Sequence, residues 1–271
     1  MSDAPERFNV LGVGIHAIDL DATAGLVARA IADGTPRYIA VTGVHGVSVA
    51  QGDPEFRAIL NGALLCTPDG MPLVWMGRLQ GHRETRRVYG PDLMLKLCDE
   101  GRARGWRHFF CGGKPGVAER LAERLRARFP GMAVAGCYTP PFRDLSEEES
   151  DELALRVRAA RADIIWVGMS TPKQERFMAR HLGHLPAPLM IGAGAAFDIH
   201  AGLLPQAPRW MQRSGIEWLF RLAAEPRRLW RRYLINNPLF ITRALLQLTG
   251  LRCYPEPGIP AAATKQAGKE T

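Results

Sequence analysis

The feature that most constrains the fold is a regular alternation of short apolar runs with longer amphipathic segments. Apolar runs that are each followed by a helical pattern are typical of parallel βαβ units. Seven runs are predicted strands: residues 8–13, 37–42, 63–66, 107–111, 132–137, 163–167 and 188–191. We therefore expect an α/β fold with a Rossmann-like, mostly parallel sheet and helices on both faces.

Helices are predicted between these strands from their start and stop signals. Gly34 and Gly105 each follow an amphipathic segment, as glycine does at helix C-termini, and Ser146 with the three glutamates after it comes close to a capping box. The predicted helices are residues 21–32, 53–61, 91–104, 115–128, 146–160 and 172–181.

The character of the chain changes after Gly202, where the strand-like runs stop. Residues 205–252 contain nine Arg, no Lys and two Glu. A helix is expected over 217–224, and Pro226 suits the first turn of another. Asn236-Asn237-Pro238 is expected to break that second helix before a third over 239–248.

These patterns divide the chain into three parts. Residues 1–202 form the expected α/β core, and residues 203–254 form a basic, aromatic, helical appendage. Residues 255–271 are rich in Pro, Ala, Gly and Lys, a composition that favours disorder. An excess of positive charge like that of the appendage implies an anionic partner, either a nucleic acid, a membrane surface or an acidic ligand.

Composition excludes several classes of protein. No apolar run approaches the ~20 residues that a membrane-spanning helix needs, and the polar N-terminus lacks the apolar region of a signal peptide. The five cysteines are widely scattered without a CxxC pair. They are expected to be reduced thiols, mostly in the core, because neither a zinc site nor a disulfide framework has this pattern.

The segment Cys66-Thr67-Pro68-Asp69-Gly70 places a carboxylate directly after a predicted strand. Open α/β sheets bind their ligands at the carboxyl ends of the strands. Pro68 and Gly70 favour a tight turn that presents Asp69 there. On residue types alone, the alternative is an Asp that caps the next helix.

Two glycine-rich loops also follow strands. Gly112 and Gly113 lie in one of them, and Gly192, Gly194 and Asp198 lie in the other. Backbone amides at such strand-to-helix turns bind phosphates, and Asp198 could bind a ribose or a base. Neither spacing is GxGxxG or a Walker A loop, so connectors built for close packing are the alternative.

Four further polar side chains are candidates for binding the substrates. Thr42 and Gln174 could bind a diphosphate or a sugar, Lys173 could bind a phosphate, and Arg87 could stabilise a leaving diphosphate. For each of them the alternative is an ordinary strand, helix or loop residue.

No metal site is predicted. The only Asp-x-Asp triplet, Asp19-Leu20-Asp21, precedes a helix and is more simply a cap. Of the seven histidines, only His181 and His184 lie one helical turn apart, and Gly183 between them indicates that the helix has ended there; no HExxH motif is present. No GxSxG motif is present, and no cysteine has the setting of a nucleophile.

Seven motifs occur in a fixed order along the chain: Val41-Thr42-Gly43-Val44-His45, Pro68-Asp69-Gly70, residues 87–94, Gly112-Gly113-Lys114-Pro115-Gly116, residues 171–175, residues 192–198 and residues 207–233. Together they resemble the WecG/TagA/CpsF glycosyltransferases, glycosyltransferase family 26. The resemblance covers roughly residues 8 to 250, and many family members carry Asn where this chain has His45.

The resemblance implies an inverting transfer of a sugar from UDP to a polyprenyl-diphosphate-linked acceptor at the cytoplasmic face of the membrane. Asp69 would be the general base, and Thr42, Arg87 and Gln174 would position the substrates. N-acetylmannosamine, its uronic acid and glucose all remain compatible as the transferred sugar. No cofactor besides the UDP-sugar donor is expected, and a homo-oligomer is possible.

The appendage is expected to bind the anionic membrane surface. Trp218, Leu222, Leu229 and Tyr233 fall at spacings that give one helical face if Pro226 does not interrupt it, and Arg221, Arg228 and Arg232 fall on an adjacent face. The alternatives are a helix packed on the core, a nucleic-acid-binding protein that uses the basic segment, and a nucleotide-dependent oxidoreductase.

Overall fold

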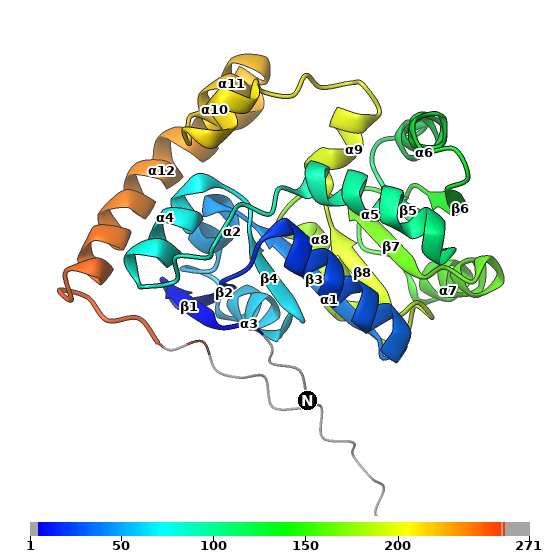
Figure 1. Ribbon diagram of the computed structural model, residues 1–271, viewed down its shortest axis with the longest axis horizontal. Helices are drawn as coiled ribbons and strands as arrows, with labels where there is room; N and C mark the ends of the chain where they lie inside the picture. Colours follow the sequence, from blue (N-terminus) through cyan, green and yellow to red (C-terminus); the bar gives the residue numbers. More distant parts are fainter. Residues whose placement is uncertain (1–4, 256, 258–271) are drawn as a thin grey trace, which may run out of the picture.

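The structure is a computed structural model that describes residues 5–255 and residue 257. At its centre lies a parallel sheet of six strands in the order β4-β3-β8-β7-β5-β6 (Figure 1). The strands are β3 (Arg37–Thr42), β4 (Leu65–Pro68), β5 (Arg107–Gly112), β6 (Ala133–Tyr138), β7 (Ile164–Gly168) and β8 (Leu189–Gly192). Every pairing in this sheet is parallel. The predicted α/β fold is therefore confirmed, and all six carboxyl ends lie at one edge.

The predicted first strand, residues 8–13, is interrupted at Leu11 and Gly12 and does not join the parallel sheet. The chain forms an antiparallel hairpin there, with β1 (Arg7–Val10) paired to β2 (Val13–His16). Leu11 and Gly12 adopt φ angles of 53° and 85°. Two consecutive positive φ angles make the tight hairpin turn whose twist matches that of the paired strands.

Helices connect and cover the strands. The six predicted helices are all present with shifted ends: α1 (Leu20–Asp33), α3 (Pro54–Gly62), α5 (Gly90–Arg104), α6 (Val117–Arg128), α7 (Glu147–Ala160) and α8 (Lys173–Arg180). The side chain of Asp19 accepts the Ala22 amide and so caps α1, as predicted. Three short helices that follow strand ends were not predicted: α2 (Val44–Val49), α4 (Met71–Leu79) and α9 (Gly194–His200).

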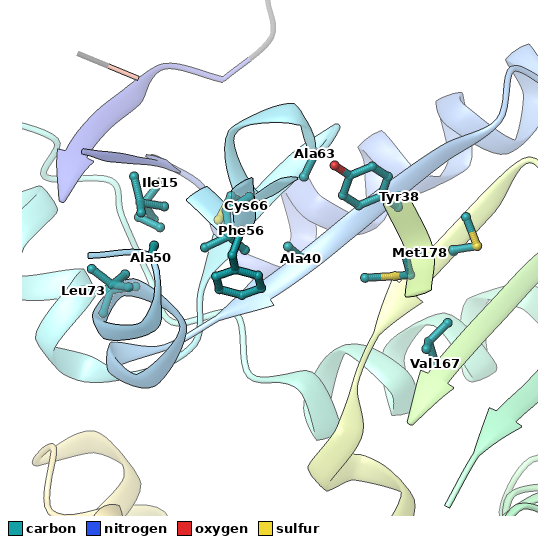
Figure 2. Packing of buried hydrophobic residues seen from close by; sticks show 14 of the residues in the cluster. Ile15, Tyr38, Ala40, Ala50, Phe56, Ala63, Cys66, Leu73, Val167 and Met178 are labelled. Atoms are coloured by element: carbon teal, nitrogen blue, oxygen red, sulfur yellow. The ribbon is translucent and has the colours of Figure 1, made fainter. Parts of the chain in front are cut away.

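Alternating side chains of the strands fill two separate hydrophobic layers. Tyr38 and Ala40 of β3 belong to the layer that also holds α3, α8 and the β1–β2 hairpin, as Figure 2 shows around Phe56. Ile39 of β3 belongs to the opposite layer, which holds α1, α5, α6 and α9. The sheet is thus covered on both faces, as parallel sheets are.

The segment after Gly202 forms three helices: α10 (Arg209–Arg213), α11 (Glu217–Ala224) and α12 (Pro226–Leu248). The expected break at residues 236–238 is wrong, because α12 continues through Pro238. Phe240 and Ala244, which follow the proline, are buried in the first hydrophobic layer. Their burial offsets the hydrogen bond that Pro238 cannot donate. The expected disordered tail, 255–271, lies outside the described residues except for 255 and 257.

Candidate active site

Asp69 lies at the carboxyl end of β4, where the backbone holds it in place. Its amide donates to the Thr42 carbonyl at 2.8 Å and so extends the pairing of β3 with β4 by one step. Gly70 then turns the chain at a φ of 139° into α4. A Cβ on Gly43 would lie 2.9 Å from the carbonyl oxygen of Asp69. Glycine at position 43 therefore allows the close approach of these two strand ends, and glycine at position 70 allows the turn.

Asp69 faces a cavity of about 420 Å³. The cavity is bounded by the loops after β3 and β4, by α4, and by α11 and α12 of the C-terminal segment. Its polar end contains Asp69, Arg87, Glu217, Arg221 and Arg232. Residues far apart in the sequence therefore meet at the sheet edge where α/β proteins bind ligands.

Arg87 connects the strand-end loop to the C-terminal segment. Its Nη2 lies 3.5 Å from Oδ1 of Asp69 and 2.6 Å from Oε2 of Glu217. Its guanidinium also lies 3.9 Å from the centre of the Tyr89 ring. Burial alone lowers the pKa of Arg87, but the charges of Asp69 and Glu217 outweigh burial and raise it. Arg87 therefore remains a cation beside the carboxylate.

The pKa of the Asp69 carboxyl is raised to about 6, mainly by burial. The charge of Glu217 contributes to this rise, whereas Arg87 and Arg221 oppose it. A carboxyl group with a pKa near the working pH is well suited to accept a proton from a substrate hydroxyl. Its side chain is still 28% exposed, so a ligand in the cavity can reach it.

Arg221 and Arg232 bring two further positive charges into the cavity. Among the described residues, neither guanidinium lies within ion-pair distance of a carboxylate, and Nε of Arg232 is buried without a hydrogen-bond partner. Burial and the charges of Arg221 and Arg228 lower the pKa of Arg232 to about 10. Partly buried cations without a carboxylate partner are costly, and an anionic ligand would compensate them.

His45 connects α2 to α12 at the side of the cavity. Its Nδ1 lies 3.3 Å from Nδ2 of Asn236, and a hydrogen bond to the Thr171 backbone raises its pKa. Burial and the charge of Arg232 outweigh that bond and lower the pKa to about 4. The imidazole is therefore neutral near neutral pH, with Nδ1 as the acceptor for the Asn236 amide.

Comparisons with known proteins identify the family of this chain. The model of the glycosyl transferase WecG/TagA/CpsF family matches residues 8–253. The chain belongs to this family. It is therefore a glycosyltransferase, as the motifs predicted.

Two relatives carry the same name, N-acetylglucosaminyldiphosphoundecaprenol N-acetyl-beta-D-mannosaminyltransferase. The protein from Bacillus spizizenii is 31% identical over 196 residues, which are 72% of this chain and 74% of the relative. The protein from Bacillus subtilis is 27% identical over 205 residues, which are 76% of this chain and 78% of the relative.

Two family-motif residues lie beneath the cavity and do not line it. Thr42 is buried, and its Oγ1 is 3.4 Å from Sγ of Cys66. Gln174 is also buried; its Oε1 accepts the Gly194 amide at 3.1 Å, and its Nε2 donates to Glu175. The side-chain amide of Gln174 thus connects the segment after β7 to the segment after β8. These contacts hold the two segments in place at the carboxyl edge of the sheet.

The glycines predicted to bind the donor are needed for close packing in this structure. A Cβ on Gly112 would lie 2.6 Å from the Gly168 backbone, and one on Gly113 would lie 2.9 Å from Val117. Gly192 and Gly194 pack against the Gln174 side chain, at 3.0 Å and 2.9 Å by the same measure. None of these four glycines lines the cavity.

Lys173 and Asp198 also lie outside the cavity lining. Nζ of Lys173 donates to the Phe142 carbonyl at 3.1 Å and lies 3.8 Å from the centre of its ring. Asp198 is half-buried, and its pKa is raised by burial and by the charge of Glu225.

The residues predicted to contact a membrane lie in two different places, some in the cavity and one outside it. Trp218, Arg221 and Arg232 line the cavity, where the Trp218 ring lies 5.9 Å from that of Tyr233. Arg228 is exposed on the outside, with its Nε 2.7 Å from Oε1 of Glu225. Trp218 and Tyr233 lie on different helices, because α11 ends before Glu225 and α12 begins after it at Pro226, so the condition for one continuous helical face is not met.

Sequence reasoning missed Glu217, which completes the ion pairs around Arg87. Its one signal was that it is one of only two glutamates in a segment with nine arginines. Among the described residues, no cluster of three or more His, Cys, Asp or Glu could hold a metal ion. Within the same residues, no helix is long and apolar enough to cross a bilayer.

Proposed function

We propose that this glycosyltransferase moves a sugar from a UDP-sugar to a hydroxyl group of a polyprenyl-diphosphate-linked saccharide, in bacterial surface polysaccharide synthesis. The observation that carries this proposal is the position of Asp69, a carboxyl with a raised pKa, opposite Arg87, Arg221 and Arg232 in one cavity. The names of both relatives support a saccharide on a diphospho-prenol as the acceptor.

The proposed reaction is a single displacement with inversion. Asp69 accepts the proton of the acceptor hydroxyl as its oxygen forms a bond to the anomeric carbon. The bond between that carbon and the phosphate oxygen breaks at the same time, and UDP leaves with the electron pair. Arg221 and Arg232 stabilise the negative charge that develops on the diphosphate.

Arg87 has a different part in this proposal. It is held by Glu217 and by the Tyr89 ring, so it fixes the direction of the Asp69 carboxylate without neutralising it. Thr42 and Gln174 support the strand ends from below, and therefore act by positioning.

We further propose that the protein works at the inner face of the cytoplasmic membrane. Large apolar side chains on α10–α12 are exposed outside the cavity, namely Trp210, Leu219, Trp230, Leu234, Ile235 and Leu239. Exposed arginines accompany them, namely Arg209, Arg213, Arg227 and Arg231. Apolar and basic side chains together suit an anionic bilayer interface.

The decisive experiment measures UDP release from a panel of UDP-sugars, with N-acetylglucosamine-diphosphoprenol as the acceptor. N-acetylmannosamine is the first donor sugar to test, followed by its uronic acid and glucose, because the relatives are mannosaminyltransferases. We expect acceptor-dependent UDP release with one donor. UDP release that never depends on a lipid-linked acceptor would contradict the proposal.

A further inference from the structure

The cavity continues beyond its polar end as an apolar groove between α4 and α12, which lie beside each other in Figure 1. Trp75 and Leu79 of α4 form one wall, at the i, i+4 spacing of a single helix face. Ile241, Leu245 and Leu248 of α12 form the other wall. The groove therefore runs from the neighbourhood of Asp69 toward the ends of both helices.

The walls and the floor of the groove differ in exposure. Leu79 is 70% exposed, and Ile241 and Leu245 are each 57% exposed. Met76 and Ala244, which lie at the bottom, are buried. Soluble proteins rarely leave a contiguous apolar surface of this kind uncovered unless something binds to it.

The width of the groove is fixed at its far end by one backbone carbonyl. The oxygen of Asn9, in the β1–β2 hairpin, accepts Nε2 of Gln80 at 2.9 Å and Nε2 of Gln247 at 2.8 Å. Gln80 follows the last residue of α4, and Gln247 lies in the last turn of α12. The two helices are thereby joined at their ends, so the groove exists before a ligand arrives.

The cavity as a whole fits a ligand that carries charge at one end and hydrocarbon at the other. Arg221 and Arg232 lie at the polar end without carboxylate partners among the described residues, and the opposite end is apolar. We propose that the first isoprene units of the acceptor's prenyl chain bind between α4 and α12. This inference rests on the proposed function and adds to it a binding site for the chain.

The dimensions agree with a short stretch of the chain. With a rise of 1.5 Å per residue, the wall from Ile241 to Leu248 is about 10 Å long, which suits a few isoprene units. The remainder of the chain would leave between Leu79 and Leu248, which are both exposed. The enzyme would then recognise the lipid directly, besides any contact of its surface with a bilayer.

The test compares two acceptors in solution without vesicles: N-acetylglucosamine diphosphate esterified with farnesol, and the same compound esterified with methanol. Calorimetry without donor measures the Kd of each acceptor, and UDP release measures its KM. We expect the farnesyl compound to bind at least about tenfold more tightly, because its apolar surface is removed from water. Equal affinity of the two compounds would contradict binding of the prenyl chain in the groove.

A matched pair of variants locates the binding site. Ile241→Ser with Leu245→Ser alters the groove wall, whereas Leu234→Ser with Ile235→Ser alters equally exposed residues of α12 that do not line the cavity. The groove variant should lose most of the preference for farnesyl, with its Kd for the methyl compound unchanged. The control variant should retain the preference. Loss of the preference in both variants, or in neither, would overturn the assignment.

The two proposals fail in distinguishable ways. A farnesyl preference in Kd that depends on Ile241 and Leu245, without UDP release from any donor, would support prenyl binding in the groove and contradict the proposed reaction. Turnover of both acceptors with equal Kd and KM would support the proposed reaction and contradict prenyl binding in the groove. A farnesyl preference that arises only when vesicles are added would also contradict it.

Discussion

Nη2 of Arg87 lies 2.6 Å from Oε2 of Glu217, and this ion pair joins the loop before α5 to the first turn of α11. Both side chains are largely shielded from solvent, with 15% and 12% exposure. Arg87 therefore contacts Asp69 from a fixed position, and the C-terminal segment forms part of the polar end of the cavity. Glu217 in turn places a negative charge near the carboxyl group that is proposed to accept the proton.

The first prediction concerns the proposed base. Asp69→Asn should reduce turnover by at least about a hundredfold, because the amide cannot accept the proton. Folding and UDP binding should be preserved, since the backbone contacts that hold residue 69 do not involve its side chain. Steady-state rates at saturating acceptor, together with a thermal melt and UDP calorimetry, provide the check. Near-normal turnover would remove Asp69 from the role of base.

The second prediction concerns pH. Since the Asp69 carboxyl has a pKa of about 6 and acts when ionised, kcat/KM should fall as the pH decreases through about 6. Glu217→Gln removes a negative charge that raises this pKa. The fall in kcat/KM on acidification should therefore occur at lower pH in this variant. Glu225→Gln is the matched control, because Glu225 pairs with Arg228 outside the cavity. If kcat/KM of Glu217→Gln fell at the same pH as in the unmodified protein, or at a higher pH, this electrostatic account would be contradicted.

The third prediction sets stability against ligand binding. Arg232→Met should raise the Tm of the free protein by a few degrees, because it replaces a cation whose Nε is buried without a partner. The same change should weaken UDP binding, which is measured as a smaller rise in Tm when UDP is added. Arg228→Met, at an exposed arginine of the same helix, should alter neither quantity appreciably. An Arg232→Met protein with normal UDP affinity would show that this arginine does not meet the diphosphate.

The fourth prediction concerns metal ions. We expect transfer to continue in excess EDTA, because arginines are proposed to stabilise the leaving diphosphate. Rates with and without the chelator, followed by addition of Mg²⁺ or Mn²⁺, test this expectation. Loss of activity that either ion restores would require a metal in the mechanism.

The fifth prediction concerns the membrane surface. Trp230→Ala with Leu234→Ala should weaken co-sedimentation with anionic liposomes at both low and high salt, because their contribution is apolar burial. Arg227→Glu with Arg231→Glu should weaken it mainly at low salt, where about 1 kcal/mol per arginine is expected. Unchanged binding by both double variants would exclude this face of α12 as the membrane contact.

The parts of the protein that depend on local patterns could be predicted from the amino-acid sequence. The alternation of apolar runs and helical segments predicted the parallel sheet, because periodicity along the chain decides which side chains a strand or a helix can bury. Pro68 and Gly70 indicated the turn that presents Asp69 at a strand end, since both residues restrict or release the backbone locally.

The surroundings of Asp69 depend on contacts between distant segments and could not be predicted from local patterns. Glu217 meets Arg87 across 130 residues of chain, and no spacing rule connects two such positions. The burial of Phe240 and Ala244 carries α12 through Pro238, and the rotation of α11 and α12 directs Arg221 and Arg232 into the cavity while Arg228 stays outside. Local preferences are small beside the burial of a helix face in the core, so packing between distant segments sets these directions.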